Sequence, residues 1–259
     1  MSSAIGVVCN DLAYGAAVAE LPQRTRRTRD APAAIVVVSG NGNWCDGVRS
    51  AAAGGALAVI VSHPGVVPGA DIRALSGAVA DLPVVLERLH FRQDAAFDAV
   101  AGRAEPDSGD VRLVAVDGAA VAAQVGTVLR DAIAWARVLT GGTLGRHAAS
   151  GALALLNDSG PKGVVAALNV VEVDAGDSWI RGHALGETRT EVEVTTERTV
   201  VSTAGQQGSA VAPTRFETSQ RLALRRALDA LGGGDQPLDL AQLVADAELA
   251  EQLTGTGSL

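Results

Sequence analysis

Apolar runs alternate with helix-periodic segments over the first third of the chain. The segment 4–23 has the pattern of a strand, a short polar loop and a helix. The segment 32–64 repeats this pattern and adds a further strand, which ends at His63 and Pro64. A helical segment at 70–80 and a strand at 82–91 follow. Strands and helices that alternate at this spacing predict parallel β-α units.

The pattern changes after about residue 105. A strand at 110–118 precedes a long amphipathic helix at 118–142, which two glycines end. Strand-like runs follow at 146–156, 164–174, 178–185, 190–197 and 198–205. Val alternates with Thr or Glu in the fourth of these runs, as in an antiparallel strand with one wet face. Two helices end the chain, and Asp239 is the expected N-cap of the second.

These patterns predict an α/β fold with two domains. Residues 1–105 are expected to form a truncated Rossmann-like parallel sheet domain, and 106–259 an α+β domain with an open, mainly antiparallel sheet and C-terminal helices. Between the first helix and the next strand the chain has only "PQRTRRTRDAP". The second strand of the parallel sheet and its helix are therefore expected to be deleted.

Composition excludes several classes of function. The net charge of −8 argues against a general surface for nucleic acid or anionic membranes. The two cysteines, Cys9 and Cys45, indicate neither a disulfide framework nor a metal site, and the four histidines lack ligand spacing. The N-terminus has no basic region before an apolar stretch, so we expect a cytoplasmic protein.

His63 is the first candidate for chemistry, because strand ends of parallel sheets carry the active sites of α/β proteins. An imidazole there serves as a general acid or base, and the alternative is a polar residue that binds nearby backbone. The loop "SGNGNW" offers free amides with Ser39, Asn41, Asn43 and Trp44 to a small polar ligand. The alternative for this loop is ordinary turn chemistry.

Two arginine-bearing segments have equally open interpretations. Arg92, at the end of the 82–91 strand, is placed to bind a carboxylate or phosphate, or it is an exposed strand end. The stretch "RTRRTR" contains four arginines that either form a solvated loop or bind an acidic partner or anionic ligand. These four residues are Arg24, Arg26, Arg27 and Arg29.

Trp179, Arg181 and His183 share one face of a strand by the period-two rule. If that face is turned toward the site, the three side chains form a platform for a ligand. If it is turned outward, they belong to an oligomer interface, where Trp and Arg are favoured. We prefer the interface.

The stretch "AAIVVVSGNGNWCDGVRSAAAGGALAVIVSHP" resembles the strand, loop, Ala-rich helix and strand that precede the Glu-Lys-Pro of the Gfo/Idh/MocA oxidoreductase family. The two C-terminal helices resemble the helix pair of the same family. The resemblance covers nearly the whole chain and implies a nicotinamide-binding domain followed by a sheet domain that supplies substrate contacts and a dimer surface.

The motifs of that family are altered at each position that carries chemistry. "CNDLAYG" replaces the Gly-x-Gly-x-x-Gly phosphate loop, so that Asn10 takes the tight turn, Asp11 brings a negative charge and only Gly15 remains. His63 stands in place of the catalytic lysine. Asp131 matches the first Asp of the family's Asp-x-Gly-x-His-x-x-Asp motif, whereas Trp135 replaces its His.

We therefore expect a protein of this descent that has lost the dinucleotide site and takes no cofactor. It would be a cofactor-independent enzyme that uses His63 on a small polar metabolite, with Arg92 and Asp131 as further catalytic candidates. Otherwise it would be a non-catalytic subunit paired with an active paralogue. The alternative is an NAD(P)-dependent oxidoreductase with an atypical loop and His63 in place of lysine. Association into a homo-oligomer, or a hetero-oligomer with a paralogue, is expected through the C-terminal sheet.

Overall fold

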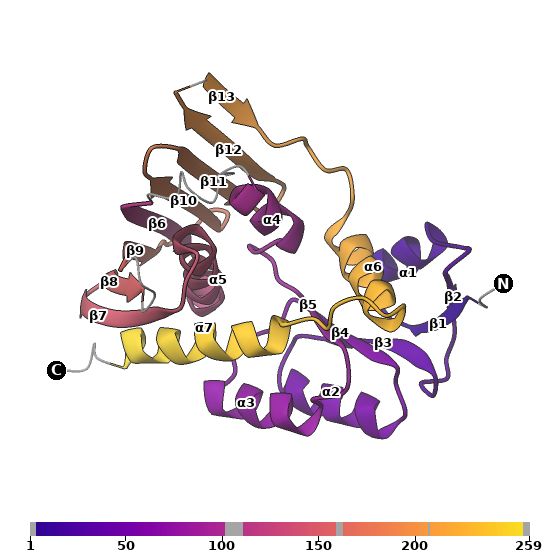
Figure 1. Cartoon of the computed structure of the whole chain (residues 1–259). Coiled ribbons are helices and arrows are strands. Elements are labelled where there is room, and N and C mark those ends of the chain that lie inside the picture. Colours follow the sequence, from indigo (N-terminus) through magenta and orange to yellow (C-terminus); the bar gives the residue numbers. More distant parts are fainter. Residues whose placement is uncertain (1–3, 102–110, 159–162, 207, 256–259) are drawn as a thin grey trace. The chain divides into compact units, whose positions relative to one another are not determined.

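The computed structural model describes residues 4–101, 111–158, 163–206 and 208–255, which belong to two compact units (Figure 1). Unit 1 comprises Met1–Arg88 and Arg215–Ala245, and unit 2 comprises Leu89–Thr214 and Asp246–Leu259. Each unit thus contains two separate stretches of the chain. The domain boundary expected near residue 105 falls outside the described residues.

Unit 1 is built on a five-stranded parallel sheet with the order β2-β1-β3-β4-β5. Its strands are β1 (Ile5–Val8), β2 (Thr25–Arg27), β3 (Ala34–Ser39), β4 (Ala58–Ser62) and β5 (Val84–Glu87). Its helices are α1 (Leu12–Ala19), α2 (Trp44–Ala53), α3 (Gly69–Ala78) and α6 (Ser219–Leu231), and α7 (Asp239–Thr254) begins in this unit. The chain moves outward on one side of β1 to β2 and then on the other side to β3, so the strand order reverses between β1 and β3.

The second strand of this sheet is present, which corrects the expectation that it is deleted. Thr25 to Arg27 pair in parallel with Ile5 to Val7 of β1. The strand was missed because its only buried side chain is Thr25, whose hydroxyl donates to the carbonyls of Val18 and Leu21 at 3.0 Å. The sequence also predicted that the helix after this strand is absent. Residues 28–33 contain no helix, in agreement with that prediction.

Both faces of the unit 1 sheet are covered by helices, and its interior strand β4 is accordingly buried along four of its five residues. Figure 1 shows α1 and α6 on one face of the sheet and α2 and α3 on the other. The core on the α1 and α6 side joins Ile35 and Ile60 of the sheet to Tyr14 of α1 and Leu224 of α6. The C-terminal helix α6 therefore completes the core of the N-terminal sheet.

Unit 2 contains an eight-stranded mixed sheet with the order β13-β12-β11-β10-β6-β9-β8-β7. Its strands are β6 (Leu113–Ala120), β7 (Leu144–Ser150), β8 (Leu153–Asp158), β9 (Val165–Glu172), β10 (Trp179–Leu185), β11 (Arg189–Thr195), β12 (Thr199–Gly205) and β13 (Gly208–Val211). The pair β6 and β9 is parallel, whereas the other pairs are antiparallel. This agrees with the predicted open, mainly antiparallel sheet.

Helix α5 (Ala122–Thr140) packs across β6, β9 and β10, and α4 (Gln93–Ala101) packs against α5, β11 and β12. Gly141 ends α5 in the left-handed conformation, with φ of 80°, as the glycine pair of the sequence predicts. Buried and open positions alternate along β6, β9, β10 and β11, so one face of the sheet carries the helices and the other is open. Within the described residues, no helix combines the length and apolarity that crossing a membrane requires.

Candidate functional site

The carboxyl ends of β1 and β3 form the topological switch point of unit 1. Ligands of open α/β sheets bind in the crevice at such a point. Asn10 and Asp11 follow β1 there, and Ser39 and Asn41 lie at the end of β3; all four residues are exposed. The structure thus brings the predicted residues Asn10, Ser39 and Asn41 to one edge of the sheet.

The loop after β1 leads into helix α1, whose N-terminus is capped by a side chain and lies near an arginine. Asp11 is the N-cap of α1, and its Oδ1 accepts a hydrogen bond from the Ala13 amide at 2.6 Å. Arg27, at the end of β2, donates from Nη2 to the Cys9 carbonyl at 3.1 Å. A Cβ added at Gly15 would lie 3.6 Å from Arg27 Nη1, so the guanidinium lies against the first turns of α1. The Arg27 guanidinium therefore lies near the end of the helix that Asp11 caps.

The loop after β3 supports the segment that carries His63. A Cβ added at Gly40 would clash with the His63 carbonyl oxygen. Only glycine therefore allows the backbone at residue 40 to lie this close to the backbone of His63. The Gly40 amide donates to the Ser62 carbonyl at 2.7 Å. Trp44 is buried, and its indole Nε1 donates to the Gly65 carbonyl at 3.1 Å. Asn43 donates from Nδ2 to Asp46 at 2.6 Å.

His63 lies at the carboxyl end of β4 in a conformation that a non-glycine residue seldom adopts. Its φ is 50°, in the left-handed region. Its backbone amide donates to the Glu87 carbonyl at 2.8 Å, and its imidazole Nε2 lies 3.5 Å from Glu87 Oε1. The side chain is 47% exposed, so the imidazole is held from one side and open on another. Strained residues of this kind often mark functional sites.

The carboxylate of Glu87, at the end of β5, is buried beneath His63 and was not predicted from the sequence. Its side chain is 1% exposed. Oε2 accepts from the Tyr14 hydroxyl at 2.7 Å and from the Ser62 hydroxyl at 2.8 Å. Oε1 accepts from the Ser219 hydroxyl at 2.6 Å and from Gln220 Nε2 at 2.8 Å. The sequence signal for this site is an acidic residue at the end of a fully buried strand, where charged side chains are rare.

Tyr14 serves as a neutral donor in this cluster. Burial raises the pKa of the Tyr14 hydroxyl well above its usual value, and the neighbouring Glu87 carboxylate raises it further. The hydroxyl therefore remains protonated over the whole physiological pH range. It supplies the hydrogen bond that a buried carboxylate needs.

The other predicted residues, Arg92, Asp131 and Trp135, belong to unit 2. Asp131 and Trp135 are buried in α5, where Asp131 Oδ2 accepts from the His90 amide at 3.0 Å and Trp135 Nε1 donates to the His90 carbonyl at 2.7 Å. Arg92 donates to both oxygens of Asp94, at 3.1 and 2.8 Å. These contacts fix the segment between β5 and α4. A role of the three side chains in catalysis or ligand binding stays a prediction.

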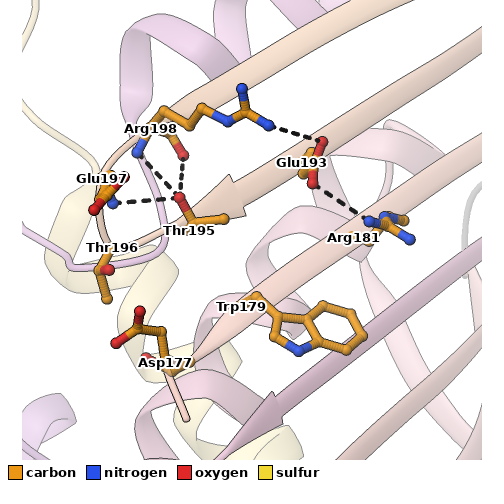
Figure 2. A pocket seen from close by; sticks show the side chains of 9 residues that line it. Asp177, Trp179, Arg181, Glu193, Thr195, Thr196, Glu197 and Arg198 are labelled. Carbon is orange, nitrogen blue, oxygen red and sulfur yellow. Dashed lines mark hydrogen bonds and ion pairs between the residues drawn. The ribbon is translucent and has the colours of Figure 1, made fainter.

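Unit 2 also has a shallow pocket of about 490 Å³ on the open face of its sheet, between β10, β11 and the turn after β11 (Figure 2). Figure 2 shows Arg181 and Arg198 directed at the two oxygens of Glu193, at 3.3 and 3.8 Å. The Arg181 guanidinium also lies 5.8 Å from the centre of the Trp179 ring. Three charged side chains of this pocket, Arg181, Glu193 and Arg198, thus pair with one another.

No protein-family model and no curated protein matches the sequence. Solved structures match nearly the whole chain. UDP-N-acetylglucosamine 3-dehydrogenase GnnA from Acidithiobacillus ferrooxidans is 14% identical, with a TM-score of 0.64 over 97% of this chain and 88% of that chain. A variant of KijD10, a 3-ketoreductase from Actinomadura kijaniata in complex with TDP-benzene and NADP, is 16% identical, with a TM-score of 0.64 over 98% of both chains.

The fold is that of the Gfo/Idh/MocA oxidoreductases. A third structure of this fold is GenD2 from gentamicin A biosynthesis in complex with NAD, which is 14% identical, with a TM-score of 0.61 over 100% of this chain and 95% of that chain. The resemblance found in the sequence is confirmed at the level of the fold.

The comparison corrects the expectation that the chain takes no cofactor. The matching KijD10 and GenD2 structures are complexes with NADP and NAD, which points to a nucleotide cofactor in proteins with the Gfo/Idh/MocA fold. The comparison therefore favours the alternative of an NAD(P)-dependent oxidoreductase over the main expectation of a lost site.

Proposed function

We propose that this protein is an NAD(P)-dependent oxidoreductase in which His63 exchanges the proton with the substrate oxygen. The observation that carries the proposal is the position of His63. Its half-exposed imidazole lies at the carboxyl end of β4, next to the loop that follows β3 at the switch point. By its sequence resemblance to the Gfo/Idh/MocA family, this position corresponds to the family's catalytic lysine.

The donors at the switch point fit a dinucleotide. The amides at the start of α1 and the Arg27 guanidinium would receive the phosphates, because a helix N-terminus and an adjacent cation both attract anions. The loop from Ser39 to Asn43 would lie along the nicotinamide half. Asp11 departs from the usual glycine-rich loop, and Arg27 lies near the end of the helix that Asp11 caps.

The cofactor and individual residues of unit 1 have separate roles in the proposed reaction. The bound nicotinamide supplies or accepts a hydride. His63 donates a proton to the substrate oxygen during reduction and removes it during oxidation, which an imidazole does readily near neutral pH. Gly40 and Trp44 keep the His63 segment in place through their contacts with the β4–α3 loop.

A small polar sugar or sugar nucleotide is the proposed substrate class. GnnA is a UDP-N-acetylglucosamine 3-dehydrogenase and KijD10 a 3-ketoreductase, and the aldose-aldose oxidoreductase from Caulobacter crescentus also matches, with a TM-score of 0.64. A panel of UDP-N-acetylglucosamine, other sugar nucleotides and free aldoses, offered with NADP and NAD, tests this class. Reduced cofactor formed with one member supports the proposal, and none formed with any member speaks against it.

Arg27 is proposed to select NADP over NAD. It ends β2, where dinucleotide folds recognise the adenosine ribose, and an arginine there accommodates a 2′-phosphate. Arg27→Ala is expected to weaken NADPH binding about 10- to 100-fold and NADH binding by a clearly smaller factor, because only NADPH loses a charge-assisted contact with the 2′-phosphate. Fluorescence titration of both cofactors measures the effect.

Arg26→Ala is the matched control for this experiment. Arg26 is the neighbouring exposed arginine of β2, and its Nε lies 3.4 Å from the Ala4 carbonyl. Side chains alternate along a strand, so Arg26 points to the other face of the sheet from Arg27. Equal losses of NADPH affinity in the two variants would show that general positive charge, and not a 2′-phosphate contact, explains the binding.

We also propose that the open face of the unit 2 sheet binds a second copy of the chain. The face exposes apolar side chains on four strands: Leu113, Leu153, Leu155, Val165 and Leu185. It also carries Arg181 beside Glu193, and a face with both charges can pair with itself across a two-fold axis.

Leu155→Arg is expected to convert the dimer to a monomer, because it places a charge in the apolar part of that face. Sedimentation should give about twice the chain mass of 26.2 kDa for the wild type and the chain mass for the variant. Val100→Arg, at an exposed position of α4, should leave the dimer intact. A monomeric wild type would rule out this proposal.

A further inference from the structure

The Glu87 carboxylate is a charge that the fold holds away from water. Burying a charge is costly unless hydrogen bonds compensate it. Here hydroxyl and amide donors reach both oxygens from α1, β4 and the start of α6. Charge-assisted hydrogen bonds of this length are strong. The carboxylate is therefore fixed in position. Its hydrogen bonds also link β5 to α1, β4 and α6 within unit 1.

Glu87 also contacts His63 through two different groups. Its carbonyl oxygen accepts the His63 amide at 2.8 Å, which helps to hold the left-handed backbone of that residue. Its Oε1 lies 3.5 Å from His63 Nε2. A purely structural carboxylate, satisfied by the donors from α1, β4 and α6, would have no need of this second contact.

We propose that Glu87 is a positioning residue that turns Nε2–H of His63 inward and leaves Nδ1 as the atom that exchanges the proton with the substrate. The inference rests on the proposed function of His63 and assigns the reacting nitrogen within it. A ring nitrogen that faces a carboxylate carries a proton, and the hydrogen bond at one nitrogen sets the role of the other. The proton then moves between Nδ1 and the substrate oxygen while Nε2–H is retained.

The sharpest test is ¹⁵N and ¹H NMR of the His63 ring in the full chain without cofactor or substrate. The wild type is expected to show a resolved Nε2–H proton, because the contact with Glu87 slows its exchange with water. Glu87→Gln should abolish that resonance, since the anion is lost while the side chain keeps its size. Ser219→Ala is the matched control: it removes one donor to Oε1 but keeps the carboxylate, and the resonance should remain.

A folded Glu87→Gln variant that keeps the Nε2–H resonance overturns the proposal, as does a wild-type ring protonated at Nδ1 alone. If Glu87→Gln does not fold, Glu87→Asp keeps the charge but withdraws it from His63 by about one carbon–carbon bond, near 1.5 Å. Loss of the resonance in that variant supports the proposal, and its persistence overturns it. The readout needs no turnover, so failure of the proposed oxidoreductase activity leaves this result interpretable.

Discussion

Replacing His63 with alanine is expected to lower kcat for the sugar substrate identified in the panel by about 10²- to 10⁴-fold, the usual contribution of general acid–base catalysis. NADPH binding should remain within about 3-fold of the wild type, because none of the proposed phosphate contacts is removed. Steady-state rates from NADPH absorbance, together with fluorescence titration, measure the two effects separately.

His147→Ala is the control for this experiment, because His147 is an exposed histidine of β7 in unit 2. It should turn over substrate at the wild-type rate. If His63→Ala also retains the wild-type kcat, His63 does not transfer the proton and the catalytic proposal fails.

Asp239→Ala is expected to lower the free energy of unfolding by about 3–5 kcal/mol, the cost of breaking a buried ion pair. Asp239 is buried at the start of α7, where its oxygens accept from Arg226 Nη2 and Nη1 at 2.6 and 2.9 Å. Its Oδ2 also accepts from the Leu86 amide at 2.8 Å, next to Glu87. The substitution therefore leaves a guanidinium and a strand amide uncompensated at the end of β5. Urea unfolding followed by circular dichroism measures the loss.

Asp229→Ala supplies the matched comparison on the surface of the same unit. Asp229 pairs with Arg24 at 2.8 Å, but their side chains are 49% and 44% exposed. Its loss should therefore cost less than about 1 kcal/mol, as for most exposed pairs. Similar losses in the two variants would mean that burial does not set the strength of the Asp239 contacts.

The strands of the parallel sheet were predictable where burial on both faces leaves a continuous apolar run. Ala58 to Val61 is such a run, and its β-strand and the helices around it appear where the pattern places them. The strand Thr25–Arg27 was not predictable in this way. It is buried through one threonine and held by its pairing with β1, so its two arginines gave it the pattern of a loop.

The candidate site was predictable only in part. His63 stands out because a titratable residue follows an apolar strand, and this local signal needs no knowledge of distant contacts. Glu87 owes its role to donors from Tyr14 and Ser219, which lie 73 and 132 residues away in the sequence. Likewise, the hydrogen bonds of Asp131 and Trp135 with the His90 backbone depend on how α5 packs. Such contacts follow from tertiary structure and leave no local pattern.

Titration of the wild-type protein with NADPH, followed by nicotinamide fluorescence, shows whether the chain binds a nicotinamide dinucleotide. We expect saturable binding of one dinucleotide per chain, with a Kd on the order of 1–100 μM, within the range common for enzymes and their substrates. Absence of binding at concentrations up to about 1 mM, the upper end of that range, would contradict it.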